Sequence, residues 1–132
     1  MRKFIAFFEI PAADFSRAVD FYETVFDVKL PVFECEQEKM ASFMEEGETV
    51  GGIFYAPEFP ISEDGKPVHF QPSEHGVLIH FNCDDITETL RKVIEKGGKV
   101  IVPRTKIEAD CKGWFAVFKD SEGNRIGIYA DK

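Results

Sequence analysis

The chain has 132 residues, of which 44% are hydrophobic, and a formal net charge of −8 at pH 7. A chain of this length and apolar content can bury a core without staples from disulfides or metals. An acidic chain that lacks a cluster of Lys or Arg is repelled by phosphate backbones, so we expect no nucleic-acid partner.

The amino-terminal apolar run is interrupted by Glu9 and Pro11, which leave it far too short to span a membrane. No later segment is long enough either, so we expect no membrane partner. The cysteines, at positions 35, 83 and 111, are odd in number and irregularly spaced. This pattern argues against a disulfide framework, and a reducing cytoplasmic location is the simplest interpretation.

The first part of the chain predicts a strand, a helix and three further strands. Residues 4–10 are rich in aromatic and β-branched side chains, which favour a strand. Asp14 can cap the next helix, in which apolar residues recur at helical spacing as far as Phe26. Strands are then expected over residues 28–35, 40–44 and 50–56.

The last part of the chain repeats this order of elements. Asp85, with Glu88 three residues later, resembles a capping box, and Gly97 and Gly98 end the helix that follows. The strands expected around this helix cover residues 77–83, 99–102, 114–118 and 125–130. A polar turn over residues 120–124 connects the last two of them.

The spacing shows that the two parts are copies of one module. Asp14 and Asp85 lie 71 residues apart, and so do Asp27 and Gly98. A repeat of this length is a unit of several packed elements. The sequence therefore predicts one α+β domain of paired βαβββ modules, about 1–56 and 77–132. The connecting segment, 57–76, carries four prolines and is expected to be a surface connection whose further role is open.

Three segments together resemble the vicinal oxygen chelate superfamily, which includes glyoxalase I, extradiol dioxygenases and bleomycin-resistance proteins. They are the start of the first helix at 14–22, the helix exit at 97–100 and the turn at 120–126. The resemblance covers nearly the whole chain. It implies that each module curls into half of a cup, usually within a homodimer.

Metal-dependent members of that superfamily carry one His, Glu or Gln ligand on the first and last strand of each module. On this chain the resemblance puts those four places at Phe7, Gly52, Leu78 and Gly127. A divalent cation needs about three converging protein donors, and none of these side chains is one. We therefore expect the fold of the superfamily with no metal and no other cofactor.

Side chains alternate along a strand, so the residue two positions further on faces the same way. This step leads from the four metal places to Glu9, Phe54, His80 and Tyr129. Glu9 and His80 interrupt apolar runs at matching places, which makes them candidates for catalytic acid/base residues. Alternatively they satisfy each other or the backbone and only fix strand register, or one faces the helices or a dimer interface.

The cup is also expected to bind a small organic ligand through aromatic side chains, and the candidates are Phe7, Phe54, Trp114 and Tyr129. One function is a binding module that sequesters a drug or metabolite by stacking flat apolar molecules. The other is a metal-independent lyase or isomerase that uses Glu9 and His80 as acid and base. The sequence identifies neither the ligand nor a reaction, and it does not say whether one chain or two build each cup.

Overall fold

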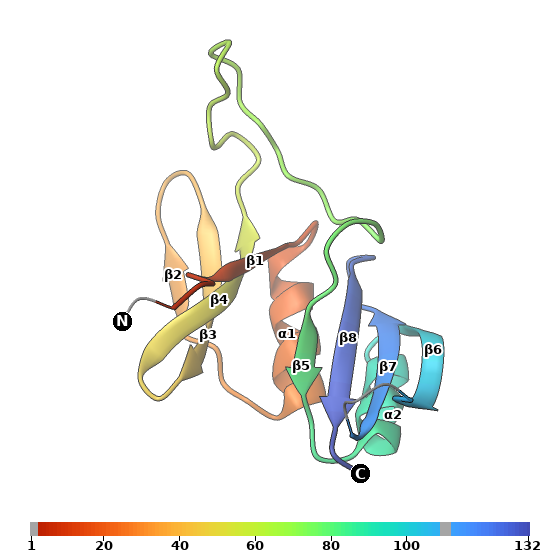
Figure 1. The fold of residues 1–132 in the computed structure, drawn as a ribbon. Helices are drawn as coiled ribbons and strands as arrows, with labels where there is room; N and C mark the ends of the chain where they lie inside the picture. Colours follow the sequence, from red (N-terminus) through yellow and green to blue (C-terminus); the bar gives the residue numbers. More distant parts are fainter. Residues whose placement is uncertain (1–2, 109–111) are drawn as a thin grey trace. The chain divides into compact units, whose positions relative to one another are not determined.

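The computed structural model describes residues 3–108 and 112–132. Its elements, in chain order, are β1 (Phe8–Pro11), α1 (Phe15–Phe26), β2 (Val32–Glu34), β3 (Lys39–Glu45), β4 (Glu48–Tyr55), β5 (His80–Asn82), α2 (Ile86–Glu95), β6 (Lys99–Lys106), β7 (Trp114–Lys119) and β8 (Arg125–Ala130). The strands form two four-stranded sheets, ordered β1–β4–β3–β2 and β5–β8–β7–β6 (Figure 1). The expected α+β fold of paired βαβββ modules is confirmed.

The two sheets have the same connectivity. In each, the first strand runs parallel to the last, and the remaining neighbours are antiparallel. The register places Glu9 opposite Gly52 in the first sheet and His80 opposite Gly127 in the second. The repeat read from sequence spacing is therefore also a repeat of strand pairing.

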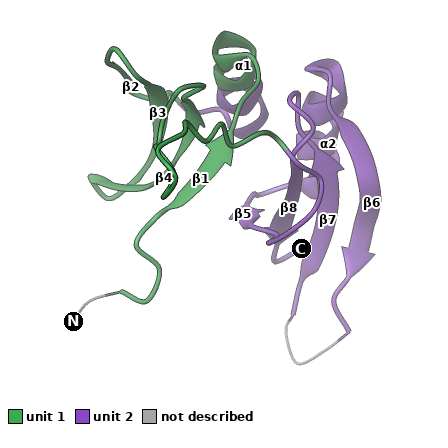
Figure 2. Cartoon of the chain, turned by 90° about the horizontal axis from the view of Figure 1, so that it is seen from above, with its two compact units in different colours: residues 1–19, 29–72 green, residues 20–28, 73–132 purple. Residues whose placement is uncertain are grey.

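The chain divides into two compact units (Figure 2). Unit 1 contains residues 1–19 and 29–72, and unit 2 contains residues 20–28 and 73–132. The units differ from the modules of the repeat because α1 begins in unit 1 and continues in unit 2. Neither helix in the described part of the chain is long and apolar enough to cross a lipid bilayer.

The core of unit 1 lies on one face of its sheet. Ile10, Ile53 and Ala41 are register partners across β1, β4 and β3, and each is at most 3% exposed. Alternation turns Glu9, the residue before Ile10, to the opposite face of the sheet, where its side chain is exposed.

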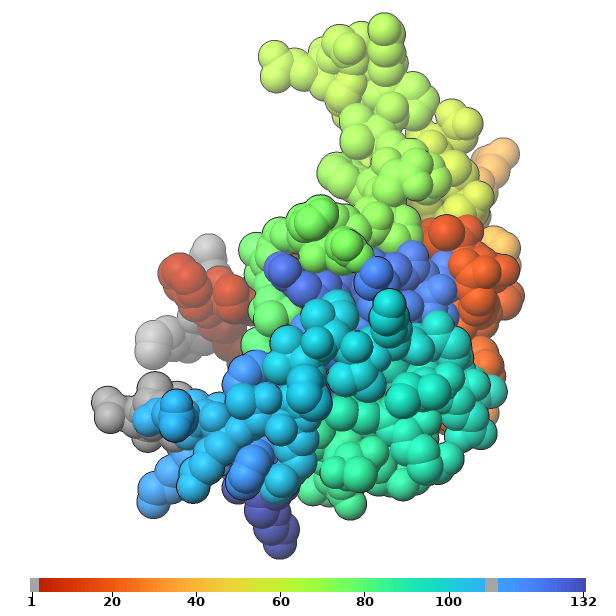
Figure 3. Space-filling view, turned by 90° about the vertical axis from the view of Figure 1, so that its right-hand side faces the viewer, coloured from red at the N-terminus to blue at the C-terminus, as the bar shows by residue number. Residues whose placement is uncertain are grey.

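The core of unit 2 is built on the inner face of β7 and β8. Phe118 is fully buried, and its ring centroid lies 5.9 Å from that of Phe21 in α1. From α2, Ile86 and Val93 are buried as well. The outer face of α2 carries ion pairs of Arg91, and Figure 3 shows α2 and β6, coloured teal to cyan, as a solvent-facing surface.

Both helices begin where the sequence predicts. A carboxylate oxygen of Asp14 accepts a hydrogen bond from the Arg17 amide, and Asp85 accepts one from the Glu88 amide, both at 3.1 Å. The Glu88 carboxylate bonds to Arg91 and does not reach back to the cap, so α2 has a capping residue without the reciprocal half of a capping box.

The first strand of each sheet is shorter than predicted. The strand predicted over 77–83 covers only the three residues of β5. Before it, the Gly127 amide of β8 donates to the Ile79 carbonyl, and the Arg125 amide donates to the carbonyl of Ser73 and not to residue 77. Val77 has no partner residue on β8 in the strand pairing and is 91% exposed. In unit 1, Phe4 is fully exposed and β1 starts only at Phe8. Strand propensity alone does not make a strand where the partner is missing.

The connecting segment contains no helix, as expected, and forms a short hairpin around an isolated bridge between Ile61 and Pro67 (Figure 1). Its last residues are held on unit 2. The Ser73 amide donates to Asn124 at 3.0 Å, the Arg125 guanidinium donates to the Gly76 carbonyl at 2.6 Å, and Glu74 pairs with Lys119 at 2.6 Å.

The turn between β7 and β8 is organised around the carboxylate of Asp120, which is only 3% exposed. One of its oxygens accepts from the Glu122 and Asn124 amides at 2.8 Å. The other accepts from the Tyr22 hydroxyl at 2.6 Å and from the Asn124 side chain at 3.1 Å. Burial raises the pKa of the Asp120 carboxyl, against the opposite effect of these hydrogen bonds. The residues predicted as a polar turn therefore contain a buried carboxylate that ties α1 to the sheet.

Replacement of Tyr22 by Phe should lower the free energy of unfolding by about 1.5–3 kcal/mol, because it removes a buried hydrogen bond to a charged group. Urea denaturation measures this loss. Tyr55→Phe is the matched control, since the Tyr55 hydroxyl has no hydrogen bond to any described residue, and it should cost less than about 0.5 kcal/mol. Equal losses in the two variants would contradict the role given to Asp120.

Candidate ligand-binding site

A pocket of about 550 Å³ lies in unit 2 on the exposed face of the sheet. The residues that line it come from β5, β7, β8 and the position that follows β6, and they are His80, Asn82, Ile107, Phe115 and Tyr129. His80 and Asn82 alternate with Phe81, whose ring packs inward at 4.8 Å from Phe26. Because side chains alternate along a strand, His80 and Asn82 face the pocket and Phe81 faces the core.

Three lining side chains form one row across the sheet. Tyr129 of β8 is the register partner of Asn82 on one side and of Phe115 on the other. Directly opposed residues point their side chains to the same face, about 5 Å apart. The row therefore places an amide, a phenol ring and a phenyl ring side by side.

In the neighbouring row across the sheet, the position of the His80 ring depends on Gly127. His80 is the register partner of Gly127, which pairs with Val117 in turn. A Cβ atom at position 127 would lie 2.6 Å from Nε2 and 2.8 Å from Cγ of the His80 ring, closer than such atoms can approach. The missing side chain of Gly127 is therefore what allows the imidazole to lie over the sheet, edge-on to Phe115 at 6.3 Å.

The polar side chains of the pocket differ in whether their hydrogen-bonding atoms are already used within the protein. The Tyr129 hydroxyl is engaged, 2.6 Å from the Lys112 carbonyl oxygen and 3.0 Å from a carboxylate oxygen of Asp131. It presents its ring to the pocket in a fixed orientation. The side chains of His80 and Asn82 make no hydrogen bond to any described residue, so their donors and acceptors are available to a ligand.

The structure brings together only part of the predicted set within unit 2. His80 and Tyr129 line the pocket, but Trp114 does not, because alternation on β7 places it on the face of the buried Ala116. Trp114 lines a neighbouring hollow of about 610 Å³, and the guanidinium of Arg104 lies 3.6 Å from its ring centroid. Phe115 occupies the place on the pocket face.

The sequence interpretation missed Asn82, Ile107 and Phe115. The alternation that leads to His80 also leads, two residues later, to Asn82, so that signal was present. For Phe115 the needed information was the register of β7 against β8, which no pattern in either strand specifies.

The remaining candidates lie in unit 1. Glu9 shares a face with its partner Gly52 and with Phe54, which is 7% exposed, whereas Phe7 precedes β1 and is 57% exposed. Desolvation, followed by the charge of Glu38, raises the pKa of the Glu9 carboxyl above its usual value. Glu9 and His80 belong to different units, so their action as a pair stays a prediction.

The residues at the superfamily's metal places do not suit a divalent cation. Phe7 and Leu78 offer hydrocarbon only, Gly52 offers no side chain, and the His80 ring covers the position beside Gly127. Across residues 3–108 and 112–132, no three His, Cys, Asp or Glu side chains gather closely enough to hold a metal ion.

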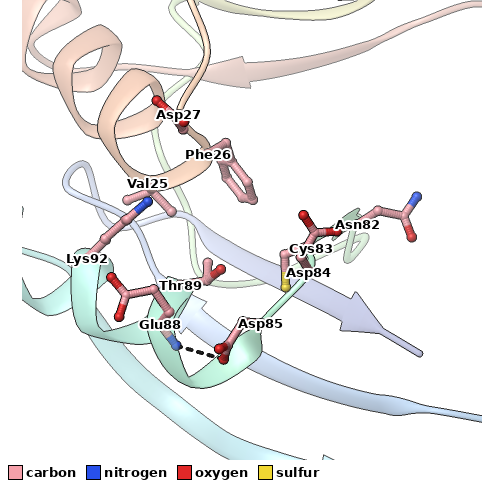
Figure 4. A pocket seen from close by; sticks show the side chains of 10 residues that line it. All are labelled: Val25, Phe26, Asp27, Asn82, Cys83, Asp84, Asp85, Glu88, Thr89 and Lys92. Atoms are coloured by element: carbon pink, nitrogen blue, oxygen red, sulfur yellow. Dashed lines mark hydrogen bonds between the residues drawn. The ribbon is translucent and has the colours of Figure 1, made fainter. Parts of the chain in front are cut away.

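A second pocket, of about 380 Å³, lies between the end of α1 and the start of α2 (Figure 4). Cys83 and Thr89 line it, together with several carboxylates. Burial raises the pKa of the Cys83 thiol, and the neighbouring Asp84 and Asp85 add to the shift. Cys83 is therefore a poor nucleophile, as its position before two carboxylates indicates. Cys111 lies outside the described residues.

A match to a known protein family identifies the superfamily to which this fold belongs. The chain belongs to the Glyoxalase/Bleomycin resistance protein/Dioxygenase superfamily, whose profile matches residues 4–128. The resemblance inferred from the sequence motifs is thereby confirmed. No curated protein matches the chain.

Solved structures agree on the fold. A glyoxylase/bleomycin resistance protein/dioxygenase domain from Frankia sp. EAN1pec is 12% identical over 100% of both chains, with a TM-score of 0.66. A glyoxalase/bleomycin resistance protein from Albidiferax ferrireducens T118 is 14% identical over 97% of this chain and 98% of its own, with a TM-score of 0.64. Glyoxalase I from Zea mays is 17% identical, with a TM-score of 0.64, over 93% of this chain but only 44% of its own. The chain thus spans less than half the length of the Zea mays enzyme, and these likenesses show the fold alone.

Replacement of Gly127 by Ala should displace the His80 ring and cost about 1–3 kcal/mol of unfolding free energy through overpacking. The same substitution in a His80→Ala background should cost less than about 0.5 kcal/mol, because the ring is gone. Urea unfolding of the four proteins gives the coupling free energy. An equal cost in both backgrounds would show that His80 does not lie over Gly127.

Proposed function

We propose that this protein binds a small aromatic organic molecule in the pocket on β5, β8 and β7, and that it serves in the sequestration of a drug or metabolite. The observation that carries the proposal is the row of Asn82, Tyr129 and Phe115 beside the imidazole of His80, which makes no hydrogen bond to a described residue. Its volume, about 550 Å³, falls within the range of roughly 300–1,000 Å³ that is usual for small-molecule sites.

The pocket is organised before a ligand arrives. The hydrogen bond that the Tyr129 hydroxyl donates to the Lys112 carbonyl fixes the orientation of its ring, and the absence of a side chain at Gly127 leaves room for the His80 ring over the sheet. Side chains that are already ordered lose less conformational entropy on binding. Flat aromatic ligands gain about 0.5–1.5 kcal/mol from each well-placed ring contact. These features support the binding of a planar molecule.

A metal-independent lyase or isomerase is the alternative function. It is favoured by the raised pKa of Glu9, since a carboxyl group shifted toward neutral pH is suited to proton transfer. His80, whose nitrogens make no hydrogen bond to described residues, is the second candidate for acid/base catalysis.

We further propose that the protein is a homodimer and that it is cytoplasmic. Unit 1 exposes several large apolar side chains, among them Phe4, Ile5, Phe7, Val32 and Phe33. Such surfaces are commonly covered by a second subunit. Analytical ultracentrifugation at micromolar concentration should give about 30 kDa, twice the chain mass of 15.0 kDa, and a 15.0 kDa species would contradict the proposal.

Phe115→Leu should weaken the binding of indole, a neutral flat probe, because it removes an aromatic wall of the pocket. The loss of about 0.5–1.5 kcal/mol corresponds to a roughly 2- to 12-fold increase in Kd, measured from chemical-shift titration of the protein amides. Phe70→Leu, at an exposed residue of unit 1, is the control and should leave Kd unchanged. Binding that is not saturable, or equally weakened in both variants, would refute the pocket as the ligand site.

Glu9→Gln and His80→Ala separate the functional roles of these residues from the structural ones. If the residues contact ligand or substrate, both variants should alter binding or turnover and leave the melting temperature nearly unchanged. Thermal denaturation and the indole titration provide the two measurements. Loss of stability without an effect on binding would assign the residues to strand register.

A further inference from the structure

The pocket on β5, β8 and β7 is lined by polar groups that lack a fixed charge. Of its five described lining residues, Ile107, Phe115 and Tyr129 form the walls, and His80 and Asn82 supply the free polar atoms. No Asp, Glu, Lys or Arg is among these five. A charged head group that entered this space would lose water without gaining an ion-pair partner, which is costly.

The charges around the pocket do not select one sign either. The neighbouring hollow, which shares Ile107 with the pocket, is lined by Lys106, Lys112, Glu108 and Asp131. Two positive and two negative side chains line it, so neither sign predominates there. At longer range the net charge of −8 repels anions. The electrostatics therefore disfavour an anionic ligand and provide no carboxylate in the pocket for a cationic one.

Asn82 defines what the pocket can recognise. Its side chain offers one carbonyl acceptor and an NH₂ donor, and neither is used by a described residue. It stands directly beside the Tyr129 ring in the same row. A carboxamide can pair with another amide through two hydrogen bonds, because each group then donates one and accepts one. A planar ligand stacked along this row brings the atoms at its edge to the Asn82 amide.

We propose that the site takes an uncharged aromatic molecule that carries a carboxamide or a ring lactam. The ring lies against Tyr129 and Phe115, and the amide edge pairs reciprocally with Asn82. His80 lies two residues along the same strand, roughly 7 Å away, and faces a second polar group of the ligand. This assignment of ligand class rests on the proposed function of the pocket.

Three probes of nearly equal shape test the class. Benzamide, benzoate and benzamidine share a phenyl ring and a planar head group, and their charges at pH 7 are neutral, negative and positive. Titrations followed at the amides of Asn82, Phe115 and Tyr129, at one salt concentration, should show benzamide binding about fivefold or more tightly than either ion. Equal affinities, or tighter binding of an ion, would overturn the assignment.

The two proposals fail in different ways. Saturable binding of indole with no preference for benzamide would leave the aromatic pocket intact and refute only the ligand class. Absence of saturable binding for indole and for all three probes would refute the proposed function itself.

Variants of Asn82 assign the preference to its side chain. Asn82→Asp keeps the shape but replaces the NH₂ donor by a charged acceptor, so it should reverse the order in favour of benzamidine. Asn82→Leu should weaken the binding of benzamide and leave both ions weak, so that the preference for benzamide shrinks. Asn82 lines the pocket between α1 and α2 as well, whereas Asp84 lines only that pocket. Asp84→Asn is therefore the control, because it changes the charge of that pocket alone and should leave the order of affinities unchanged. An order of affinities that stays the same in Asn82→Asp would overturn the proposal.

Discussion

The carboxylate of Asp120 is the group on which the arrangement of unit 2 depends, because its hydrogen bonds join three parts of the chain. Two amides of its own turn, the side chain of Asn124 and the hydroxyl of Tyr22 all donate to it. The turn sets the register of β7 against β8, and that register places Phe115 opposite Tyr129. A slip of one residue would turn one of the two rings to the other face of the sheet. The same turn, through Asn124, holds the end of the connecting segment. The buried carboxylate of Asp120 thus determines which aromatic rings face the ligand pocket.

The second constraint is the pair formed by Gly127 and His80. At a place where metal-dependent members of the superfamily are expected to carry a ligand, this chain has no side chain, and the imidazole from the neighbouring strand lies over the position. The imidazole of His80 therefore covers the position where the superfamily's metal ligand would lie. What this surface offers a ligand is an aromatic ring and its nitrogens. Shape, stacking and hydrogen bonding then determine what is bound, which explains why the fold alone does not identify the function.

The fold could be predicted because its signals are local and occur twice. The caps Asp14 and Asp85, the glycine exit of α2 and the constant spacing between the modules each require only neighbouring residues. What the sequence could not supply depends on contacts between distant residues. Tyr22 and Asp120 are 98 positions apart, and no pattern indicates that they meet. The choice of Phe115 over Trp114 depends on strand register, and the ends of β1 and β5 depend on where a partner strand begins. Glu9 and His80 as a pair remain a prediction because they belong to separate units.

The most direct test of the account is the position of a bound aromatic molecule on unit 2. Intermolecular nuclear Overhauser effects between indole and the protein would locate the ring without any substitution. The account predicts contacts from the ligand protons to the rings of Phe115 and Tyr129, and none to Trp114, which lies on the other face of β7. Contacts to Trp114 without any to Tyr129 would contradict it, since they would place the ligand in the neighbouring hollow.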